Sequence, residues 1–263
     1  MRVLLNSDNG YSNIKFYDGY NFEQIPSLVC SYNNINILQE SSDTKNIMVA
    51  KVTEDNNGVL NIKKLVVGSK AIIGRAKYNF RANKVDLENN IYPTIIGFAY
   101  MLLNNNIEKA NLDITTTLTI DDFKYSENIE KYKNVFCKKW EIEFLYGHLR
   151  GKKCKINIER NLTSAQCAVG IWDYILNDNL SLSKNVDKIL GIDIGFETTD
   201  ICIMDRMEFD DERSFTIPTG MSDYNQMVIN EINNKYSLRK TLENMENDLK
   251  RGYIGKINIK NIQ

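Results

Sequence analysis

The chain has 263 residues, of which 43% are hydrophobic and 25% charged, so it is long enough for two domains with buried cores. Its 33 Lys and Arg residues nearly balance its 34 Asp and Glu residues. The formal net charge of -1 gives no overall basic excess of the kind that favours direct binding to nucleic acid or anionic membranes.

The cysteine and histidine content excludes several classes of site. The five cysteines are widely spaced and form no C-x-x-C pair, which excludes zinc-ribbon and thioredoxin motifs. His148 is the only histidine, which disfavours histidine-based metal sites and a Ser-His-Asp triad. No apolar stretch is long enough to span a bilayer, and the N-terminus enters a strand-like segment without a signal peptide. We therefore expect a cytoplasmic protein with reduced thiols and no membrane partner.

In chain order, residues 2–6 and 13–17 are expected to form two short strands joined by a link rich in turn formers. Residues 27–80 mix short strand candidates with polar loops and are interpreted as a small inserted subdomain. The other elements expected in the first half are a helix over 93–104 with Pro93 in its first turn, a strand over 112–119, a charged helix over 123–135, and a hairpin of 141–146 with 153–158.

The second half is expected to repeat the opening pattern of two strands around an acidic, glycine-containing turn. Its expected elements are a helix over 164–177, strands over 188–192 and 200–204, a short strand over 214–217, a helix over 222–235, a helical pattern over 238–249 and a strand-like end over 256–263. The two strand–turn–strand units lie about 185 residues apart, which suggests an internal duplication.

The first of these turns has the chemistry of a phosphate-binding loop. It reads Asp8-Asn9-Gly10-Tyr11-Ser12-Asn13-Ile14-Lys15. A tight turn with glycine can point backbone N–H groups at an anion, and the Ser12 hydroxyl can donate to a phosphate oxygen. Lys15 would add positive charge, and Asp8 suits Mg²⁺, usually through water. Taken alone, the same residues also fit an ordinary hairpin connection.

The second turn strengthens the phosphate interpretation. Asp193 and Gly195 follow an apolar strand, and the hydroxyls of Thr198 and Thr199 can bond to phosphate oxygens. An acid at the end of a buried strand is costly unless it is paired or near a metal. The two turns could therefore hold a triphosphate from opposite sides, with a metal ion between Asp8 and Asp193.

These two segments resemble the phosphate-1 and phosphate-2 motifs of the actin-like ATPase superfamily, which includes actin, the seventy-kilodalton heat-shock chaperones and sugar kinases. The second match, Gly191-Ile192-Asp193-Ile194-Gly195-Phe196-Glu197-Thr198-Thr199-Asp200, has the form found in bacterial plasmid-segregation actins of the ParM type and in archaeal actin-like proteins. The resemblance implies an α/β, actin-like two-domain fold with duplicated βββαβα (ribonuclease H-like) cores around a nucleotide cleft. It places domain I at 1–165, including the inserted subdomain at about 27–80, and domain II at 166–263.

The resemblance also implies the ligands and the residues that hold them. It implies ATP or GTP with Mg²⁺, the metal being held by Asp8 and Asp193 through water. The residues expected to bind the nucleotide are Asp8, Asn9, Gly10, Tyr11, Ser12, Asn13, Lys15, Asp193, Gly195, Thr198, Thr199 and Gly220. Gly220 is included because the family has a glycine there that lets the backbone approach the nucleotide, although a plain helix start is the alternative interpretation.

In addition to Asp8 and Asp193, the resemblance implies a catalytic side chain that orients the attacking water. Gln166 is the first candidate, because residues 165–169 open a helix as the corresponding actin segment does. Thr163 and Gln166 also have the spacing of a capping box, which leaves a structural role open for Gln166. Glu159 is the second candidate, because segregation actins often carry a glutamate at the end of the preceding strand.

The implied function is a nucleotide-binding protein that polymerises into filaments with ATP or GTP hydrolysis, for plasmid or phage DNA segregation. Its implied partners are further copies of itself and, through a small centromere-binding adaptor, DNA. The chain ends 70 residues after Asp193 without the family's later glycine-rich adenosine motif, so the second domain is expected to be incomplete. A sugar-type small-molecule kinase and a non-catalytic actin-like regulatory module remain open alternatives.

Overall fold

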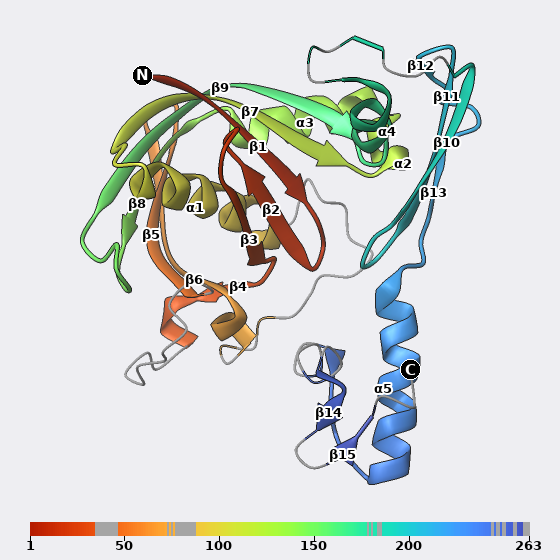
Figure 1. Cartoon of the computed structure of the whole chain (residues 1–263). Coiled ribbons are helices and arrows are strands. Elements are labelled where there is room, and N and C mark those ends of the chain that lie inside the picture. Colours follow the sequence, from red (N-terminus) through yellow and green to blue (C-terminus); the bar gives the residue numbers. More distant parts are fainter. Residues whose placement is uncertain are drawn as a thin grey trace.

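The structure is a computed structural model. It contains a large mixed β-sheet and a smaller β-sheet that lies beside it (Figure 1). It describes residues 1–34, 47–72, 74, 76, 88–177, 179, 181–182, 186–242, 245, 248, 251–254 and 257–259. The expected helix over 238–249 and the strand over 256–263 lie partly outside these residues.

The large sheet has nine strands in the order β3-β2-β1-β7-β9-β8-β5-β6-β4. These strands are β1 (Arg2–Asn9), β2 (Asn13–Tyr17), β3 (Phe22–Pro26), β4 (Val29–Ser31), β5 (Ile47–Asn56), β6 (Val59–Gly68), β7 (Lys109–Leu118), β8 (Lys139–Phe144) and β9 (Lys153–Ala165). Two parallel pairings, β1 with β7 and β7 with β9, form the centre of the sheet, and the other neighbours are antiparallel. β5 pairs with β8, so the strands within residues 27–80 extend this same sheet.

One face of the large sheet carries the main core. The helices and 3-10 turns of the first half are η1 (Tyr32–Asn34), η2 (Ser69–Ile72), α1 (Glu88–Asn104), α2 (Ile120–Phe123) and α3 (Ser126–Phe136). α1 and α3 pack on the face formed by alternate strand residues such as Leu5, Phe16 and Ile114, which are at most 1% exposed. The alternation of apolar and polar residues along these strands therefore reflects a sheet with one buried face.

The helix expected over 93–104 begins earlier, at Glu88, so the expectation that Pro93 lies in the first turn is wrong. Proline has no N–H to donate to the carbonyl of the residue four positions earlier, which is Asn89. The Ser27 hydroxyl donates to that carbonyl oxygen instead, at 2.7 Å. A contact from a distant segment thus allows the helix to continue through a proline that would otherwise mark its start.

The second half has a four-stranded sheet in which β10 pairs with β11, and β11 also pairs with β12 and β13. Its strands are β10 (Lys188–Ile194), β11 (Thr199–Asp205), β12 (Glu208–Phe209) and β13 (Phe215–Ile217), and the remaining elements are α4 (Ala168–Ile175), α5 (Met221–Tyr236), β14 (Tyr253–Ile254) and β15 (Ile257–Asn258). Figure 1 shows α5 leaving the small sheet and running away from it, with β14 and β15 alongside.

The antiparallel triplet β10-β11-β13 repeats the triplet β1-β2-β3. The triplets differ in how their corresponding faces are covered. Leu5 lies three residues before Asp8 and is 1% exposed under α1, whereas Leu190 lies three residues before Asp193 and is 59% exposed. Ile192 and Ile194 on the same face are 58% and 62% exposed. The duplicated strands therefore have one covered and one uncovered apolar face.

This difference predicts unequal costs for matched substitutions. Leu5→Ala is expected to lower the free energy of unfolding by about 2–5 kcal/mol, because it opens a cavity in the main core. Leu190→Ala is expected to cost less than about 1 kcal/mol, because the side chain already lies largely in water. Urea denaturation of both variants, followed by tryptophan fluorescence, tests the comparison. Equal losses would contradict the exposed placement of Leu190.

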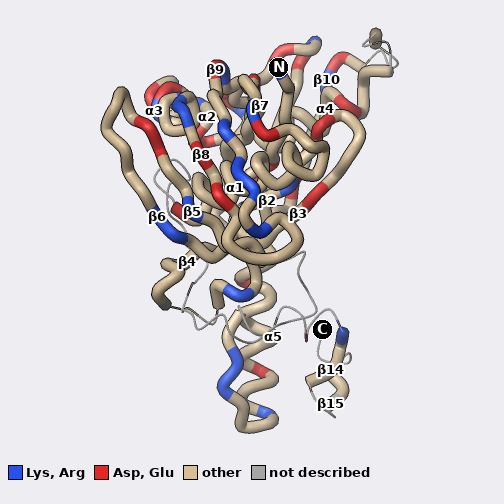
Figure 2. The backbone as a smooth tube through the Cα atoms, turned by 90° about the vertical axis from the view of Figure 1, so that its left-hand side faces the viewer, with Lys and Arg blue, Asp and Glu red and all other residues tan. Residues whose placement is uncertain are grey.

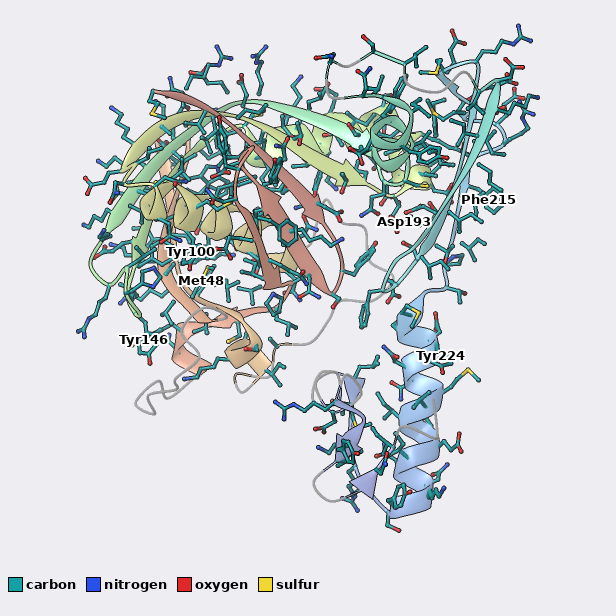
Figure 3. The ribbon with its side chains drawn as sticks, viewed as in Figure 1. Met48, Tyr100, Tyr146, Asp193, Phe215 and Tyr224 are labelled. Atoms are coloured by element: carbon teal, nitrogen blue, oxygen red, sulfur yellow. The ribbon has the colours of Figure 1, made fainter. Side chains whose placement is uncertain are left out.

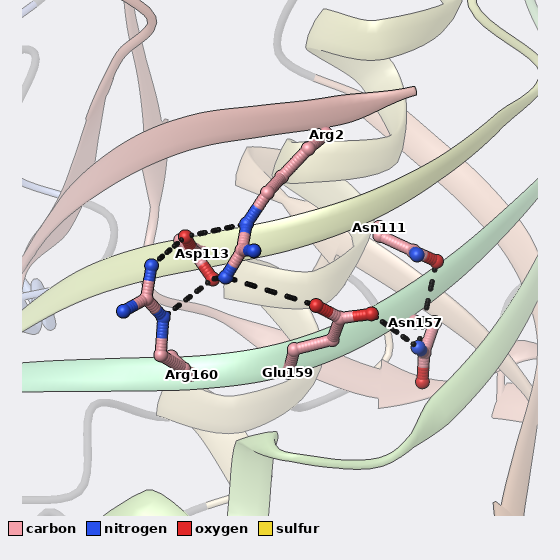
Figure 4. Close-up of polar contacts among 6 residues, drawn as sticks. All are labelled: Arg2, Asn111, Asp113, Asn157, Glu159 and Arg160. Carbon is pink, nitrogen blue, oxygen red and sulfur yellow. Dashed lines mark hydrogen bonds and ion pairs between the residues drawn. The ribbon is translucent and has the colours of Figure 1, made fainter.

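Basic and acidic residues are both found along the strands of the large sheet (Figure 2). In one network, on the face opposite α1, Asp113 of β7 accepts two hydrogen bonds from Arg2 and two from Arg160 (Figure 4). The hydrogen bonds from Arg160 and then from Arg2 hold the pKa of Asp113 well below its ordinary value of 3.8. The network joins three neighbouring strands, β1, β7 and β9.

This network predicts a pH dependence with a definite sign. Because the pKa of Asp113 is lowered in the folded protein, its contribution to stability is present above pH 3.8 and is lost as the pH falls through the lowered value. Asp113→Asn should therefore show a smaller loss of urea midpoint between pH 7 and acid than the wild type. Asp211→Asn, at an exposed turn residue, is the matched control. An unchanged acid dependence in Asp113→Asn would contradict the prediction.

Candidate functional site

The two acidic residues lie at equivalent places in the two triplets. The expected link over residues 7–12 is shorter than predicted, because β1 continues to Asn9. Asp8 is therefore a strand residue that pairs with Lys15 of β2, and Asp193 likewise pairs with Asp200 of β11. Each aspartate lies one residue before the end of its strand, so both side chains are held by sheet pairing rather than by a loop.

Both turns that follow depend on a glycine. A Cβ on Gly10 would lie 2.5 Å from the carbonyl oxygen of Asn13, which is closer than real contacts allow. A Cβ on Gly195 would lie 3.0 Å from the carbonyl oxygen of Thr198, to which the Gly195 N–H donates at 2.8 Å. The glycines that identified the turns in the sequence are thus needed for tight closure of both hairpins.

Two hollows meet at the aspartates. The first, here called the loop pocket, has a volume of about 300 Å³. It is lined by both turns, that is, by Asp8, Gly10, Tyr11, Ser12, Asn13, Lys15, Gln24, Gln166, Asp193, Ile194, Gly195, Phe196, Thr198, Asp200 and Met221. Two segments that lie far apart in the sequence therefore face one cavity, as the paired-turn interpretation requires.

The second hollow, here called the helix pocket, has a volume of about 730 Å³ and lies between α4 and β10. It is lined by Asp8, Thr117, Gln166, Cys167, Val169, Gly170, Ile171, Tyr174, Ile189, Leu190, Gly191, Ile192 and Asp193. Asp8, Gln166 and Asp193 line both hollows. Figure 3 places Asp193 on the side of the small sheet that faces the large sheet, and Phe215 on the other side.

Asp8 is the centre of a hydrogen-bonded group. Its Oδ2 accepts a charge-assisted bond from Lys15 Nζ at 2.9 Å. Its Oδ1 accepts from Thr117 Oγ1 at 3.0 Å and from Gln166 Nε2 at 3.1 Å. Strands β2 and β7 and the residue that follows β9 thus orient one carboxylate at the mouth of both pockets.

The position of Gln166 differs from both sequence interpretations in detail. The helix expected over 164–177 starts only at Ala168, and β9 continues to Ala165. Thr163 therefore belongs to a strand and cannot cap the helix, so the capping-box interpretation is wrong; Cys167 is the residue that precedes the helix. The Gln166 side chain is instead directed to Asp8, next to Asp193.

The structure does not bring Glu159 to the pockets. This residue falls at the irregularity in the β7–β9 pairing, where Leu112 pairs with Ile158 and Asp113 with Arg160. Its carboxylate lies 3.8 Å from Arg2 Nη2, at the other end of β1 from Asp8 (Figure 4). Glu159 is expected from the sequence to lie at the end of this strand, but β9 continues beyond it to Ala165.

Three of the residues expected to bind nucleotide do not line either pocket. Asn9 is fully buried, and its amide donates to Asn90 and Thr94 of α1. Thr199 donates to the carbonyl of Thr219 at 2.8 Å. Gly220 packs on the second turn, where a Cβ would lie 2.6 Å from the carbonyl oxygen of Phe196. These residues position the turns instead of facing the cavities.

Other residues of the site were not predicted from the sequence. Thr117 bonds Asp8 because β7 pairs with β1, and Gln24 reaches the loop pocket because β3 pairs with β2. Met221 enters the pocket from the start of α5. A threonine or glutamine in a strand has no local signal for such a role. Only the pairing of distant strands identifies them.

A group of hydrogen bonds holds the two halves together beside the pockets. The buried carboxylate of Asp200 accepts from the Ile120 N–H at 3.1 Å and from Thr216 Oγ1 at 2.5 Å. The Asp121 N–H donates to Thr216 Oγ1 at 3.1 Å, and the Thr216 N–H donates to the Asp121 carboxylate at 3.2 Å. The start of α2 is thereby fixed to β11 and β13, which sets where Asp193 stands relative to Asp8.

Lys15 is the cation that lines the loop pocket, beside the carboxylates of Asp8, Asp193 and Asp200. Hydrogen bonding to Asp8 raises the pKa of Lys15, and the nearby charges of Asp8 and Asp193 raise it further. The negative charges of both aspartates therefore favour the protonated, positively charged form of Lys15. Burial raises the pKa of Tyr11, and the surrounding carboxylates of Asp122, Glu197 and Asp200 add to this effect. Tyr11 therefore stays a neutral phenol.

The donor set fits Mg²⁺ better than a metal held only by protein. Asp8 and Asp193 supply carboxylate oxygens to the same two cavities. The described residues contain no group of three or more His, Cys, Asp or Glu side chains arranged to hold a metal ion. Mg²⁺ usually keeps several waters and binds through one or two carboxylates together with substrate phosphates, which is the arrangement that two such aspartates allow.

Comparison with known proteins agrees with this geometry. Residues 7–168 match the family model described as the N-terminal domain of actin-like proteins. The solved structure of Bacillus thuringiensis ParM with ATP has a TM-score of 0.71 and 15% identity, over 99% of this chain and 78% of that chain. Apo psk41 ParM has a TM-score of 0.66 and 19% identity, over 95% of this chain and 78% of that chain.

A third solved structure extends the likeness to an archaeal protein. An archaeal actin homologue has a TM-score of 0.65 and 18% identity, over 91% of this chain and 69% of that chain. Identities at this level show a shared fold alone. No match is found among curated proteins. The fold expected from the two turn motifs is thereby confirmed.

No helix among the described residues combines the length and apolar character needed to cross a membrane.

Proposed function

Because the chain belongs to the actin-like proteins, we propose that it binds a magnesium-bound nucleoside triphosphate between its two turns and assembles into filaments. The observation that carries the proposal is the shared cavity: Asp8 and Asp193 line the same two pockets although about 185 residues separate them. A ligand that contacts both aspartates necessarily contacts both halves of the molecule. Its binding can therefore select one relative arrangement of the halves.

The residues of the loop pocket have distinct roles in this proposal. The polyphosphate would lie against both turns of the loop pocket, with the Ser12 and Thr198 hydroxyls as donors. Lys15, which donates to Asp8, is the cation that would pair with the phosphate oxygens. Asp8 and Asp193 hold Mg²⁺ through water, and the ion supplies neutralisation of the phosphate charge.

Gln166 is the residue that we assign to hydrolysis. Its amide Nε2 donates to Asp8 at 3.1 Å, which leaves the amide oxygen to accept a hydrogen bond from a water molecule. Positioning of water by an amide requires no strong base, and a glutamine held in place by a carboxylate suits this role. Hydrolysis would then limit the lifetime of the filament, because loss of the terminal phosphate removes a contact between the halves.

The test of this function is nucleotide-dependent assembly. With the chain at tens of micromolar, Mg²⁺ and ATP or GTP should produce a rise in light scattering and a pelletable fraction, with filaments in negative stain. Mg²⁺ with ADP, and ATP with excess EDTA, should not. No assembly with either triphosphate would contradict filament formation. Phosphorylation of a sugar without assembly would support the kinase alternative. If calorimetry detects no heat when ATP is added, the result would support the non-catalytic regulatory module.

We also propose a role in plasmid or phage DNA segregation, which is supported by the ParM-type form of the second turn. The balanced charge of the chain favours contact with DNA through a small adaptor rather than directly. In a mobility-shift assay at physiological salt, we therefore expect the chain alone to leave duplex DNA unshifted. A tight complex between the chain alone and DNA would contradict the proposal that an adaptor makes the contact.

A further inference from the structure

Two of the cysteines meet beneath the helix pocket. Cys167 directly precedes α4, and Cys202 lies in β11. Both contribute to one apolar cluster, in which Cys202 is buried and Cys167 packs against the buried residues. Cys167 lies two residues after the end of β9, so a bond between the two cysteines would fix this segment to β11 of the small sheet.

Gly191 creates the space for this contact. It lies directly opposite Cys202 in the β10–β11 pairing. A Cβ on Gly191 would lie 2.6 Å from Cys167 Sγ, so the sulfur occupies room that only glycine leaves free. Side chains directly opposite in an antiparallel pair have Cβ atoms about 5 Å apart. Cys167 Sγ is therefore held beside the residue that pairs with Cys202, so that side-chain rotation can bring the two sulfurs together.

The two cysteines of the pair differ in their access to solvent. Cys202 is fully buried, whereas Cys167 lines the helix pocket. The neighbouring Cys167 thiol lowers the pKa of Cys202, so the Cys202 thiol differs from an isolated buried thiol. Cys154 contrasts with this pair, because burial raises the pKa of its thiol to about 12.

We propose that Cys167 and Cys202 form a reversible disulfide that fixes the segment after β9 to β11 and thereby regulates the nucleotide site. Glutathione disulfide is a sufficient oxidant. One protein thiolate attacks it to form a mixed disulfide and release one glutathione thiolate; the second protein thiolate then displaces the other glutathione. The protein loses two electrons and two protons, and one glutathione disulfide becomes two glutathione molecules.

The regulatory part of this inference rests on the proposed function. Cys167 follows Gln166, whose amide bonds to Asp8, and its backbone has the unusual φ of 68°. A covalent bond from Cys167 to β11 therefore restrains the orientation of the neighbouring Gln166 side chain. The oxidised chain is expected to assemble poorly with Mg²⁺ and ATP, and to regain assembly after reduction by dithiothreitol.

The chemical test uses the full chain and does not depend on assembly. After treatment with glutathione disulfide and alkylation, mass spectrometry of peptides should show a Cys167–Cys202 cross-link. The unfolding midpoint should rise by on the order of 5–10 °C, and dithiothreitol should reverse both changes. Cys167→Ser, at the partly exposed position, should abolish the cross-link and the shift. Cys137→Ser, at another partly exposed cysteine, should retain both.

Glutathione adducts on single cysteines without the cross-link would overturn the proposal, and so would a cross-link that persists in Cys167→Ser. If the cross-link forms but the reduced chain never assembles with nucleotide, the disulfide stands and the proposed function fails. If the reduced chain assembles and no cross-link forms, the proposed function stands and the disulfide fails.

Discussion

Replacing Asp193 with alanine is expected to weaken the binding of magnesium–ATP about a hundredfold, equivalent to about 2.7 kcal/mol, and to abolish nucleotide-dependent assembly. Asp193 lines both pockets, so its loss removes the carboxylate that the second half contributes to the shared ligand. Because this side chain is exposed, the unfolding midpoint should stay close to that of the wild type. Calorimetry with a non-hydrolysable ATP analogue measures the loss.

The matched control for this experiment is Asp211→Ala. Asp211 is exposed in the turn after β12 and lines neither pocket, so this variant should bind and assemble as the wild type does. The prediction fails if Asp193→Ala binds magnesium–ATP as tightly as Asp211→Ala. A loss confined to assembly, with normal binding, would move the role of Asp193 from the ligand to the filament contact.

Gln166→Ala is expected to slow ATP hydrolysis by on the order of 100–1000-fold while weakening nucleotide binding less than tenfold. The amide is assigned to the attacking water and not to the bound triphosphate, so its removal should act on turnover. Filaments should still form with ATP and should persist longer, because the terminal phosphate remains. Phosphate release and the decay of light scattering measure the two effects.

Gln226→Ala provides the same chemical change away from the site. Its side chain bonds to Asn230 on the exposed face of α5. This variant should hydrolyse ATP at the wild-type rate. Unchanged hydrolysis in Gln166→Ala, or equal losses of binding and turnover, would remove Gln166 from the catalytic assignment.

The parts of the site that sequence reasoning identified are those with a local signal. An apolar strand followed by an acid and a glycine marks both turns without knowledge of pairing, and the cavity contains Asp8, Gly10, Asp193 and Gly195 as predicted. Asn9 has the same local context, yet its amide is directed to α1. Strand alternation decides which neighbours of Asp8 face the pocket, and it depends on where the strand ends.

β9 shows why the strand end was misplaced. Its buried residues alternate through Cys154, Ile156 and Ile158, and the pairing irregularity at Glu159 then shifts the alternation by one residue. Beyond this point the buried positions include the polar residues Asn161 and Thr163, which lack a hydrophobic pattern. The sequence signal therefore stops at Ile158 although the strand continues, and the position of Gln166 follows from the continued strand.

The exposed face of the small sheet could not be predicted either. Leu190, Ile192 and Ile194 have the pattern of a buried strand, and in the first half the corresponding face is covered by α1. Hydrophobic pattern identifies which residues favour burial but not whether a covering element packs on them. The domain boundary at 165/166 stays a prediction, although the junction at Gln166 and Cys167 is where the two sheets meet.

The most direct test of the account is amide hydrogen exchange of the wild-type chain with and without Mg²⁺ and a non-hydrolysable ATP analogue. If one ligand is held by both turns, exchange should slow together in peptides that cover residues 8–15 and 193–199, with little change in β14 and β15. Protection of only one turn by a bound nucleotide, or of neither, would contradict the claim that the two acidic turns hold one polyphosphate between them.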